Sequence, residues 1–386
     1  MNFDQVLKLM VDKGASDLFV TAGMPPTLKL NGRLAPVGQE PLSADQAERL
    51  VLSQMTEQQR HEFSAYHECN FAINPTGIGR FRVSAFYQRN NVGMVLRAIT
   101  SDIPNIEELN LPPIIKELSL TKRGLVLFVG ATGSGKSTSL AAMIGHRNKV
   151  GSGHIITIED PIEFIHQHQG CIVTQREVGI DTESFDVALK NTLRQAPDVI
   201  LIGEVRSRET MEHALAFAET GHLCLATLHA NNANQAIDRI LSFFPSERLN
   251  QLLMDMSLNL KGIVAQQLVP ARDGESRRPA VEVLLNSPLV SDLIRAGRIN
   301  EVKGVMQRSE EIGMQTFDRA LFKLYEDEQI TYEAAIRHAD SANNLRLMIK
   351  LNGELPEDAA EMEDDMYAAS RLSLMPEGGI SKKDSD

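Results

Sequence analysis

The chain has 386 residues, 42% of them hydrophobic and 23% charged, so wholesale disorder and fibrous repeats are excluded and roughly two to three domains are expected. The net charge is −12, and ten acids against three bases fall within residues 354–386, which argues against a protein that coats nucleic acid. The longest apolar runs, such as Leu125–Val129, are too short to cross a bilayer, and no secretory signal precedes them. We therefore expect a cytoplasmic protein.

Residues 1–100 predict an α+β domain of short strands and helices. The expected elements are a strand within residues 16–23, a hairpin at Asn31-Gly32, a polar helix over Ser43–Ser64, and two strands within Gly79–Ile99 around a turn at Gln88–Gly93. The Pro-containing stretch at 101–113 then predicts a linker.

After this linker the pattern changes to buried apolar runs separated by helical stretches. The runs lie at 124–130, 153–160, 198–206 and 222–230. Such runs are typical of a parallel sheet covered on both faces, and they predict an α/β nucleotide-binding core. We expect residues from about 250 to 351 to be mostly helical with one short strand at Pro279–Leu285, and the acidic tail at 352–386 to be disordered.

The strongest motif is GATGSGKST at residues 130–138, a complete GxxxxGK[ST] between an apolar strand and a helix-forming stretch. In such a loop the backbone N–H groups close on the phosphates of ATP, Lys136 contacts the β and γ oxygens, and Ser137 ligates Mg²⁺. A plain glycine-rich turn is the disfavoured alternative. The predicted binding residues are Gly130, Thr132, Gly133, Ser134, Gly135, Lys136, Ser137 and Thr138.

Acidic residues follow two of the apolar runs. Glu204 ends the run VILIGE, and ligands of open α/β sheets gather at this carboxyl edge, so we assign Glu204 to holding Mg²⁺ through water. Asp198, at the opposite end of the run, is interpreted as structural. Glu163 is a candidate general base for the attacking water, with Glu159 in a supporting position beside the nucleotide. A solvated turn before a helix is the alternative for these two acids.

His222 and His229 flank the apolar run LCLATL. Their odd spacing of seven places them on opposite faces of an unbroken strand, which disfavours a shared metal site. His229, at the carboxyl end, is placed to sense the γ-phosphate of ATP. His222 is either a second nucleotide contact or a structural histidine.

Four segments together resemble the type II/IV secretion ATPases. They are the phosphate loop at 130–138, IEDPIEF at 158–164, LRQAPDVILIGEVR at 193–206 and TGHLCLATLHANN at 220–232. The resemblance extends to GASDLFVTAG near the start and to GMQTFDRALFKLY at 313–325, and it covers about residues 1–351. It implies an ATP-hydrolysing homo-hexameric motor with a PAS-like N-terminal domain at 1–100 and a RecA-like ATPase domain at 114–351.

Within this family the sequence is most similar to the retraction ATPases of type IV pili, the PilT and PilU group. Extension and secretion members carry an additional N-terminal domain and commonly a four-cysteine element, whereas here 129 residues precede Gly130 and no CxxC occurs. The acidic tail favours the PilU branch. The implied partners are a PilT paralogue and the platform protein of the inner membrane, at whose cytoplasmic face the motor would work, and no nucleic acid.

The resemblance also brings two arginines from the N-terminal domain to the γ-phosphate. Arg82 and Arg97 match them in position, and a planar guanidinium can bind phosphoryl oxygens in a bidentate way. Arg80 and Arg123 match less well. The sequence departs from the family at Ser207, where an Asp is usual, and at residues 289–297, which only partly resemble a helix associated with retraction.

Three other functions stay open from sequence. The first is the PilT-type ATPase itself, and the second is a nucleotide-dependent interaction protein with little turnover of its own. The third is a DNA motor, which the acidic charge and the match of four ordered segments both disfavour.

Overall fold

The computed structural model describes residues 3–30, 32–100 and 102–352. The tail predicted at 352–386 lies outside the described residues except for its first position. The described chain divides into two compact units that interleave in sequence. One consists of residues 3–109, 113–126 and 137–228, and the other of residues 110–112, 127–136 and 229–352.

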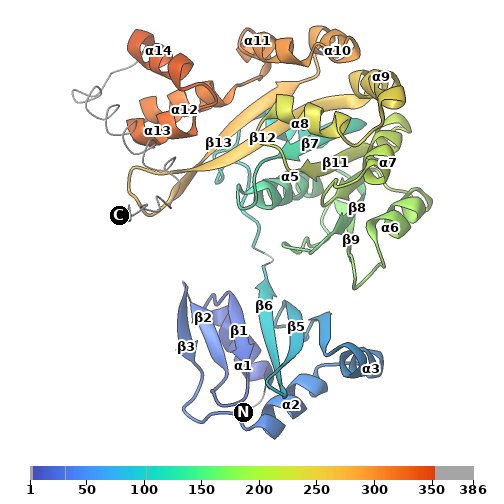
Figure 1. Cartoon of the computed structure of the whole chain (residues 1–386), viewed down its shortest axis with the longest axis vertical. Coiled ribbons are helices and arrows are strands. Elements are labelled where there is room, and N and C mark those ends of the chain that lie inside the picture. Colours follow the sequence, from blue (N-terminus) through green and yellow to red (C-terminus); the bar gives the residue numbers. More distant parts are fainter. Residues whose placement is uncertain (1–2, 31, 101, 353–386) are drawn as a thin grey trace, which may run out of the picture. The chain divides into compact units, whose positions relative to one another are not determined.

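The N-terminal domain is an antiparallel sheet with helices packed on it (Figure 1). Its elements are α1 (Phe3–Asp12), β1 (Asp17–Val20), β2 (Thr27–Leu30), β3 (Arg33–Pro36), α2 (Ala44–Ser53), α3 (Glu57–Tyr66), β4 (Glu68–Ile73), β5 (Arg80–Gln88) and β6 (Asn91–Ile99). The strands lie in the order β3-β2-β1-β6-β5-β4, and every neighbouring pair is antiparallel.

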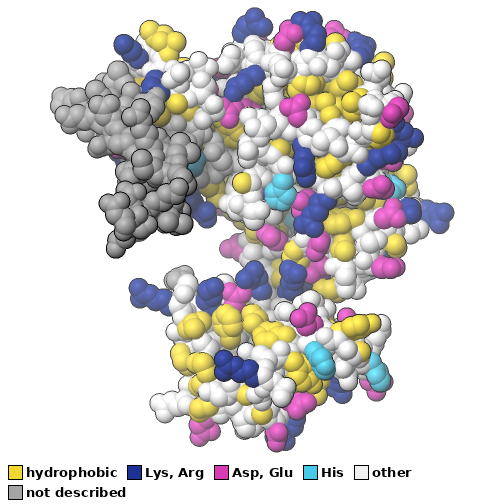
Figure 2. All heavy atoms as spheres, viewed as in Figure 1, with side chains coloured by type: hydrophobic (Ala, Val, Ile, Leu, Met, Phe, Trp, Pro, Cys, Tyr) yellow, Lys and Arg dark blue, Asp and Glu magenta, His cyan; other side chains and the backbone are white. Residues whose placement is uncertain are grey.

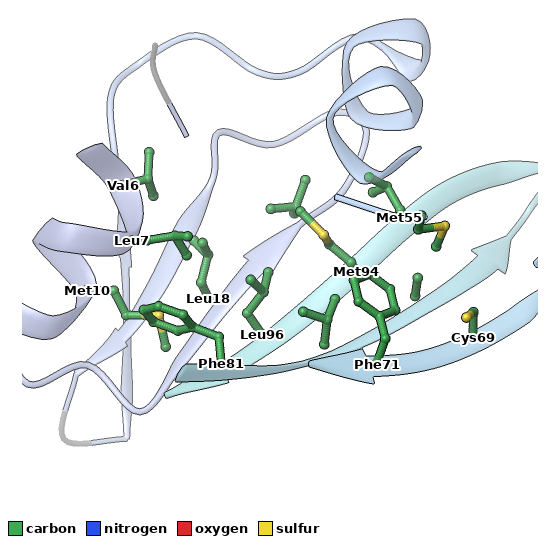
Figure 3. Packing of buried hydrophobic residues seen from close by; sticks show 14 of the residues in the cluster. Val6, Leu7, Met10, Leu18, Met55, Cys69, Phe71, Phe81, Met94 and Leu96 are labelled. Atoms are coloured by element: carbon green, nitrogen blue, oxygen red, sulfur yellow. The ribbon is translucent and has the colours of Figure 1, made fainter. Parts of the chain in front are cut away.

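One face of this sheet carries the core of the domain. The register pairs Leu18 with Leu96, so alternate residues of neighbouring strands project to the same side. They pack against apolar side chains of the helices, among them Leu7 of α1 (Figure 3). The opposite face therefore carries the other residues of each strand, including Arg82 and Arg97.

The strands of this domain follow the sequence prediction more closely than its helices do. The helix predicted over 43–64 is two helices, because Thr56 starts a new one: its hydroxyl accepts from the Gln59 N–H, and the Gln59 side chain accepts from the Thr56 N–H. Only Arg89 and Asn90, both at positive φ, join β5 to β6, so this turn is tighter than predicted. α1 and β4 are not among the predicted elements.

The second sheet has seven strands in the order β13-β12-β7-β11-β10-β8-β9. The elements up to β11 are α4 (Ile114–Leu120), β7 (Gly124–Val129), α5 (Lys136–Val150), β8 (Gly153–Glu159), β9 (Cys171–Glu177), α6 (Phe185–Thr192), η1 (Leu193–Gln195), β10 (Val199–Ile202), α7 (Arg208–Glu219) and β11 (Leu223–Leu228). β9, β8, β10 and β11 are parallel. All residues of β7, β10 and β11 are buried, which requires cover on both faces. The predicted α/β fold class is confirmed.

The remaining elements lie in the second unit. They are α8 (Ala233–Leu241), η2 (Ser246–Arg248), α9 (Leu249–Asn259), β12 (Leu260–Pro270), β13 (Arg277–Leu285), α10 (Pro288–Arg295), η3 (Ile299–Glu301), α11 (Val302–Met306), η4 (Glu310–Ile312), α12 (Phe317–Glu326), α13 (Tyr332–His338) and α14 (Ala342–Asn352). Nowhere in the described ranges is there a helix with the length and apolar character to span a bilayer.

The prediction of a single short strand in this region is wrong. Residues 260–270, predicted as helical, form β12, which pairs antiparallel with β13 from Gly262 opposite Leu285 to Pro270 opposite Arg277. The physical reason is that a short apolar run has the same hydrophobic pattern in a buried strand as in a buried helix. The long hairpin brings β12 beside β7, the strand that leads into the phosphate loop.

Candidate functional site

The phosphate loop begins directly after β7 and ends at the start of α5. Gly130, Gly133 and Gly135 have positive φ values of 155°, 77° and 88°, a backbone that favours glycine. The Lys136 Nζ donates to the carbonyl oxygens of Gly130 and Ala131 at 2.8 and 2.9 Å. The ammonium group therefore lies over the mouth of the loop, as a phosphate-binding lysine must.

Two further features make this loop suitable for binding an anion. The Ser134 hydroxyl is buried and has no hydrogen-bond partner among the described residues, so it remains able to donate to a ligand. The first turn of α5 contains no acid, which leaves the positive end of the helix dipole uncompensated. Ser137 lies exposed in that turn, and Thr138 follows it half-buried. The exposed Thr132 completes the loop.

Gln266 of β12 supports the loop, and sequence reasoning missed it because its segment was predicted as helix. This side chain is buried, with 4% of its surface exposed. A Cβ atom on Gly130 would collide with the Gln266 backbone carbonyl oxygen, and one on Gly135 would lie 2.7 Å from the Gln266 Nε2. The loop therefore packs so closely on the β12 backbone that only glycine fits at position 130.

The predicted acids lie in the first unit, at the carboxyl ends of β8 and β10. Gly203 follows β10, and its N–H donates to the Ile158 carbonyl at 2.7 Å. A Cβ on Gly203 would lie 3.0 Å from the Glu159 Cα, so glycine allows the two strand ends to approach. This approach brings Glu204 and Glu159 to the same edge of the sheet.

Glu204 is held by a residue that sequence reasoning did not single out. The Arg206 Nη2 lies 2.7 Å from the Glu204 Oε2, and its Nη1 lies 3.8 Å from the Asp160 Oδ2.

Ser207 caps α7, because its hydroxyl accepts a hydrogen bond from the Thr210 N–H. Ser and Asp cap helices about equally well, so this departure from the family leaves the helix start intact.

The remaining acids differ in their surroundings. The Asp198 Oδ2 accepts from the His154 N–H at 2.7 Å, which agrees with its structural interpretation. Glu159 accepts hydrogen bonds from Thr157 and Gln175, yet burial outweighs these bonds and raises its pKa, with the charge of Glu163 adding to the effect. Glu163 itself is exposed. The structure thus brings Glu159 and Glu163 into one electrostatic cluster.

The two histidines lie at opposite ends of β11. The His222 ring bonds to the Thr220 hydroxyl and the Phe217 carbonyl, and the His222 carbonyl accepts from the Gly124 N–H. These contacts match the structural alternative for His222. His229 is exposed and directly follows the carboxyl end of β11, the same end of the parallel strands that carries Glu204.

Arg82 and Arg97 lie directly opposite each other on β5 and β6. Figure 2 shows Lys and Arg side chains gathered along the edge of the N-terminal domain where β6 ends. The Arg97 Nε donates to the Asp17 Oδ1 at 2.9 Å. Arg80 instead lies 3.6 Å from the Glu177 carboxylate, with which it forms an ion pair.

Taken together, the structure gathers the predicted residues into three groups. The phosphate loop lies mainly in the second unit, the acids Glu159, Glu163 and Glu204 lie in the first, and the paired arginines lie on the open face of the N-terminal sheet. Asp17, Arg206 and Gln266 are further residues near these groups that sequence reasoning did not single out. Asp17 and Arg206 stand inside segments that carry the family resemblance, which was the available signal for them.

Comparison with known proteins agrees with this architecture. The family model described as "Type II/IV secretion system protein" matches residues 3–346. The type IV pilus ATPase PilU of Pseudomonas aeruginosa is 70% identical over 381 residues, which cover 96% of this chain and all of that protein. The PilT retraction ATPase of the same organism is 39% identical over 344 residues, covering 89% of this chain and all of PilT.

A solved structure gives the same result at the level of the fold. The crystal structure of the pilus retraction motor PilT with bound ADP superposes with a TM-score of 0.83 at 40% identity, covering 90% of this chain and all of that one. The resemblance inferred from the four segments is confirmed, including its closeness to PilU. The chain belongs to the type II/IV secretion system protein family.

Proposed function

We propose that this chain hydrolyses ATP at its phosphate loop and couples hydrolysis to the retraction of type IV pili. The observation that carries the proposal is the loop itself, in which three glycines at positive φ and the Lys136 ammonium form an anion cradle. The PilU and PilT relatives, both named as type IV pilus ATPases, support the assignment. The chain is an ATPase of this pilus class.

The residues of the loop and of the strand ends divide the chemistry between them. Lys136 and the loop N–H groups bind the β- and γ-phosphates of ATP. The Ser137 hydroxyl and the Glu204 carboxylate are hard oxygen ligands of the kind that Mg²⁺ prefers, so these two residues would hold it, partly through water. Bound Mg²⁺ neutralises charge that develops on the phosphate oxygens.

Hydrolysis requires a base near the γ-phosphate. In the proposed step a water oxygen attacks the γ-phosphorus, the bond to the bridging oxygen breaks, and Glu163 accepts the proton of the water. Glu163 suits this role because its carboxylate is exposed, whereas one carboxylate oxygen of Glu159 already accepts hydrogen bonds from both Thr157 and Gln175. His229 would sense the γ-phosphate from the end of β11.

The N-terminal domain would complete the site with Arg82 and Arg97, which offset the negative charge of the transferring phosphoryl group. We assign residues 1–100 to this domain, 101–113 to a linker and 114–351 to the ATPase domain. A homo-hexamer at the cytoplasmic face of the inner membrane, working with a PilT paralogue and the pilus platform protein, is the proposed assembly.

Pilus retraction in the native host tests the cellular part of the proposal. Deleting the gene should reduce the number of retracting pili, and the Lys136→Ala chain should fail to restore it while the unaltered chain does. The PilT paralogue must be deleted in parallel, so that its own activity does not mask the effect. Normal retraction in both the single and the paired backgrounds would contradict a role in retraction.

A further inference from the structure

A row of charged residues crosses the face of the N-terminal sheet that lies opposite its hydrophobic core. The register places Asp17 of β1 opposite Lys29 of β2 on one side and opposite Arg97 of β6 on the other, and Arg97 opposite Arg82 of β5. Residues in direct register lie close enough for their side chains to interact. The row therefore contains three cations and a single anion.

Asp17 differs from the rest of the row in its burial. Its side chain is 5% exposed, whereas the side chain of Arg97 is 69% exposed. Every partner of the carboxylate is a donor or a cation: the Arg97 Nε at 2.9 Å, the Ser16 hydroxyl at 2.9 Å, and the Lys29 Nζ at 4.0 Å. A carboxylate this buried is held in one position, and it can fix a partner that is not itself buried.

The contact to Arg97 is made through one particular nitrogen. Because Asp17 accepts from Nε, the two terminal nitrogens of the guanidinium remain able to donate to a phosphoryl group. Within the described ranges Arg82 makes no hydrogen bond or ion pair, although its charge acts on Glu177 and lowers the pKa of that carboxyl against the larger rise caused by burial. Asp17 thus orients Arg97 alone, and it also offsets the repulsion between two arginines in direct register.

We infer that Asp17 is a positioning residue for ATP hydrolysis, which acts by holding the Arg97 guanidinium in the orientation that meets the phosphoryl group. This inference rests on the proposed function of Arg97. An exposed arginine without a fixed partner must lose rotamer freedom each time it binds, and Asp17 removes that cost in advance. Asp17 acts when the Arg97 guanidinium contacts the transferring phosphoryl group, so its loss should lower kcat more than nucleotide affinity.

The test compares full-length Asp17→Asn, Arg97→Ala and the double variant by steady-state ATP hydrolysis. We expect Asp17→Asn to lower kcat roughly tenfold, about 1.4 kcal/mol in activation free energy, with KM changed by less than about twofold. In the Arg97→Ala background the same substitution should have no further effect, because the two residues act as one unit. Asp17→Glu, which keeps the charge, should restore part of the loss.

Two controls separate positioning from general damage. Lys29→Ala removes the other cation beside Asp17, and Glu68→Gln removes an acid from β4 of the same sheet; both should keep wild-type kcat. The inference is overturned if Asp17→Asn keeps wild-type kcat, or if it lowers the kcat of Arg97→Ala by the same factor. Should the Asn variant not fold, Asp17→Glu in both backgrounds is judged by the same two criteria. Wild-type kcat in Arg97→Ala would instead refute the proposed role of Arg97.

Discussion

The buried carboxylate of Glu282 in β13 accepts a hydrogen bond from the backbone N–H of Ala233 at 2.8 Å. Ala233 is the first residue of α8, the helix that follows His229, so a strand of the C-terminal hairpin holds the start of this helix. The other oxygen of Glu282 receives a longer bond from the Phe317 N–H at the start of α12. One acid therefore anchors two helix starts, where the helix dipole favours negative charge.

This acid makes the stability of the fold depend on pH. Burial raises the pKa of Glu282 to about 7, with the charge of Asp340 adding and the bond from Ala233 opposing. Because the folded pKa lies above the unfolded one, the stabilising contribution is full below about pH 4.5 and is lost as the pH rises through about 7. The side chain in Glu282→Gln does not ionise. Relative to wild type, the free energy of unfolding of this variant should therefore rise by on the order of 3 kcal/mol as the pH is raised from 4.5 to 8. Urea unfolding at both pH values measures this; parallel profiles for the two proteins would refute it.

The lysine of the phosphate loop should contribute to binding and to catalysis alike. Lys136→Ala removes the cation that contacts phosphate in both the ground state and the transition state, so ATP affinity and kcat should both fall, each by roughly tenfold or more. Fluorescent-nucleotide titration and phosphate release measure the two effects. Lys149→Ala, in the last turn of the same helix, is the control and should change neither. Normal affinity with a selective loss of kcat is the result that contradicts this reasoning.

The close packing of the loop on β12 predicts that Gly130→Ala is far more damaging than a positive φ alone explains. The new methyl group would collide with the backbone carbonyl oxygen of Gln266, in addition to the strain at φ 155°. Nucleotide affinity should fall roughly tenfold or more, since the loop must shift to accept the methyl group. Gly179→Ala has a positive φ of 81° with open space around it, and should lower stability by only about 1 kcal/mol without affecting nucleotide binding. Equal losses of stability in the two variants, with nucleotide binding retained, would show that packing against the β12 backbone is unimportant.

Replacing Glu163, the candidate general base, tests its role in the chemical step. Glu163→Gln should lower kcat by roughly 100-fold or more and leave ATP binding nearly intact, because the general base acts only in the chemical step. Glu183→Gln, an exposed acid of the same unit, serves as the control. Single-turnover hydrolysis beside equilibrium binding provides the measurement. If kcat is unchanged in Glu163→Gln, the role passes to another group.

Local sequence was sufficient to predict the phosphate loop and the acids at the strand ends. Each depends on a short apolar strand followed at once by a polar residue, and parallel strands carry such residues to one edge. For the same reason the family could be identified from four segments, and it is confirmed. The roles given to Glu163, Glu204 and His229 remain predictions.

The parts that sequence did not predict depend on contacts between distant residues. Asp17 and Arg97 are 80 residues apart and meet only because β1 pairs with β6. Gln266 reaches the phosphate loop only because residues 260–270 form a strand, a choice that the hydrophobic pattern of this short run could not decide. Pairing partners and register are set by the whole fold, which no single segment contains.

The central claim is that this chain turns over ATP, and the rate of phosphate release by the purified full-length protein tests it most directly. With ATP and Mg²⁺ the wild-type chain should release phosphate continuously, and Glu204→Gln should reduce the rate by roughly 100-fold or more while retaining bound ATP. ATP binding without phosphate release above the Lys136→Ala background would contradict the claim, and would make this chain a nucleotide-dependent interaction protein instead of a motor.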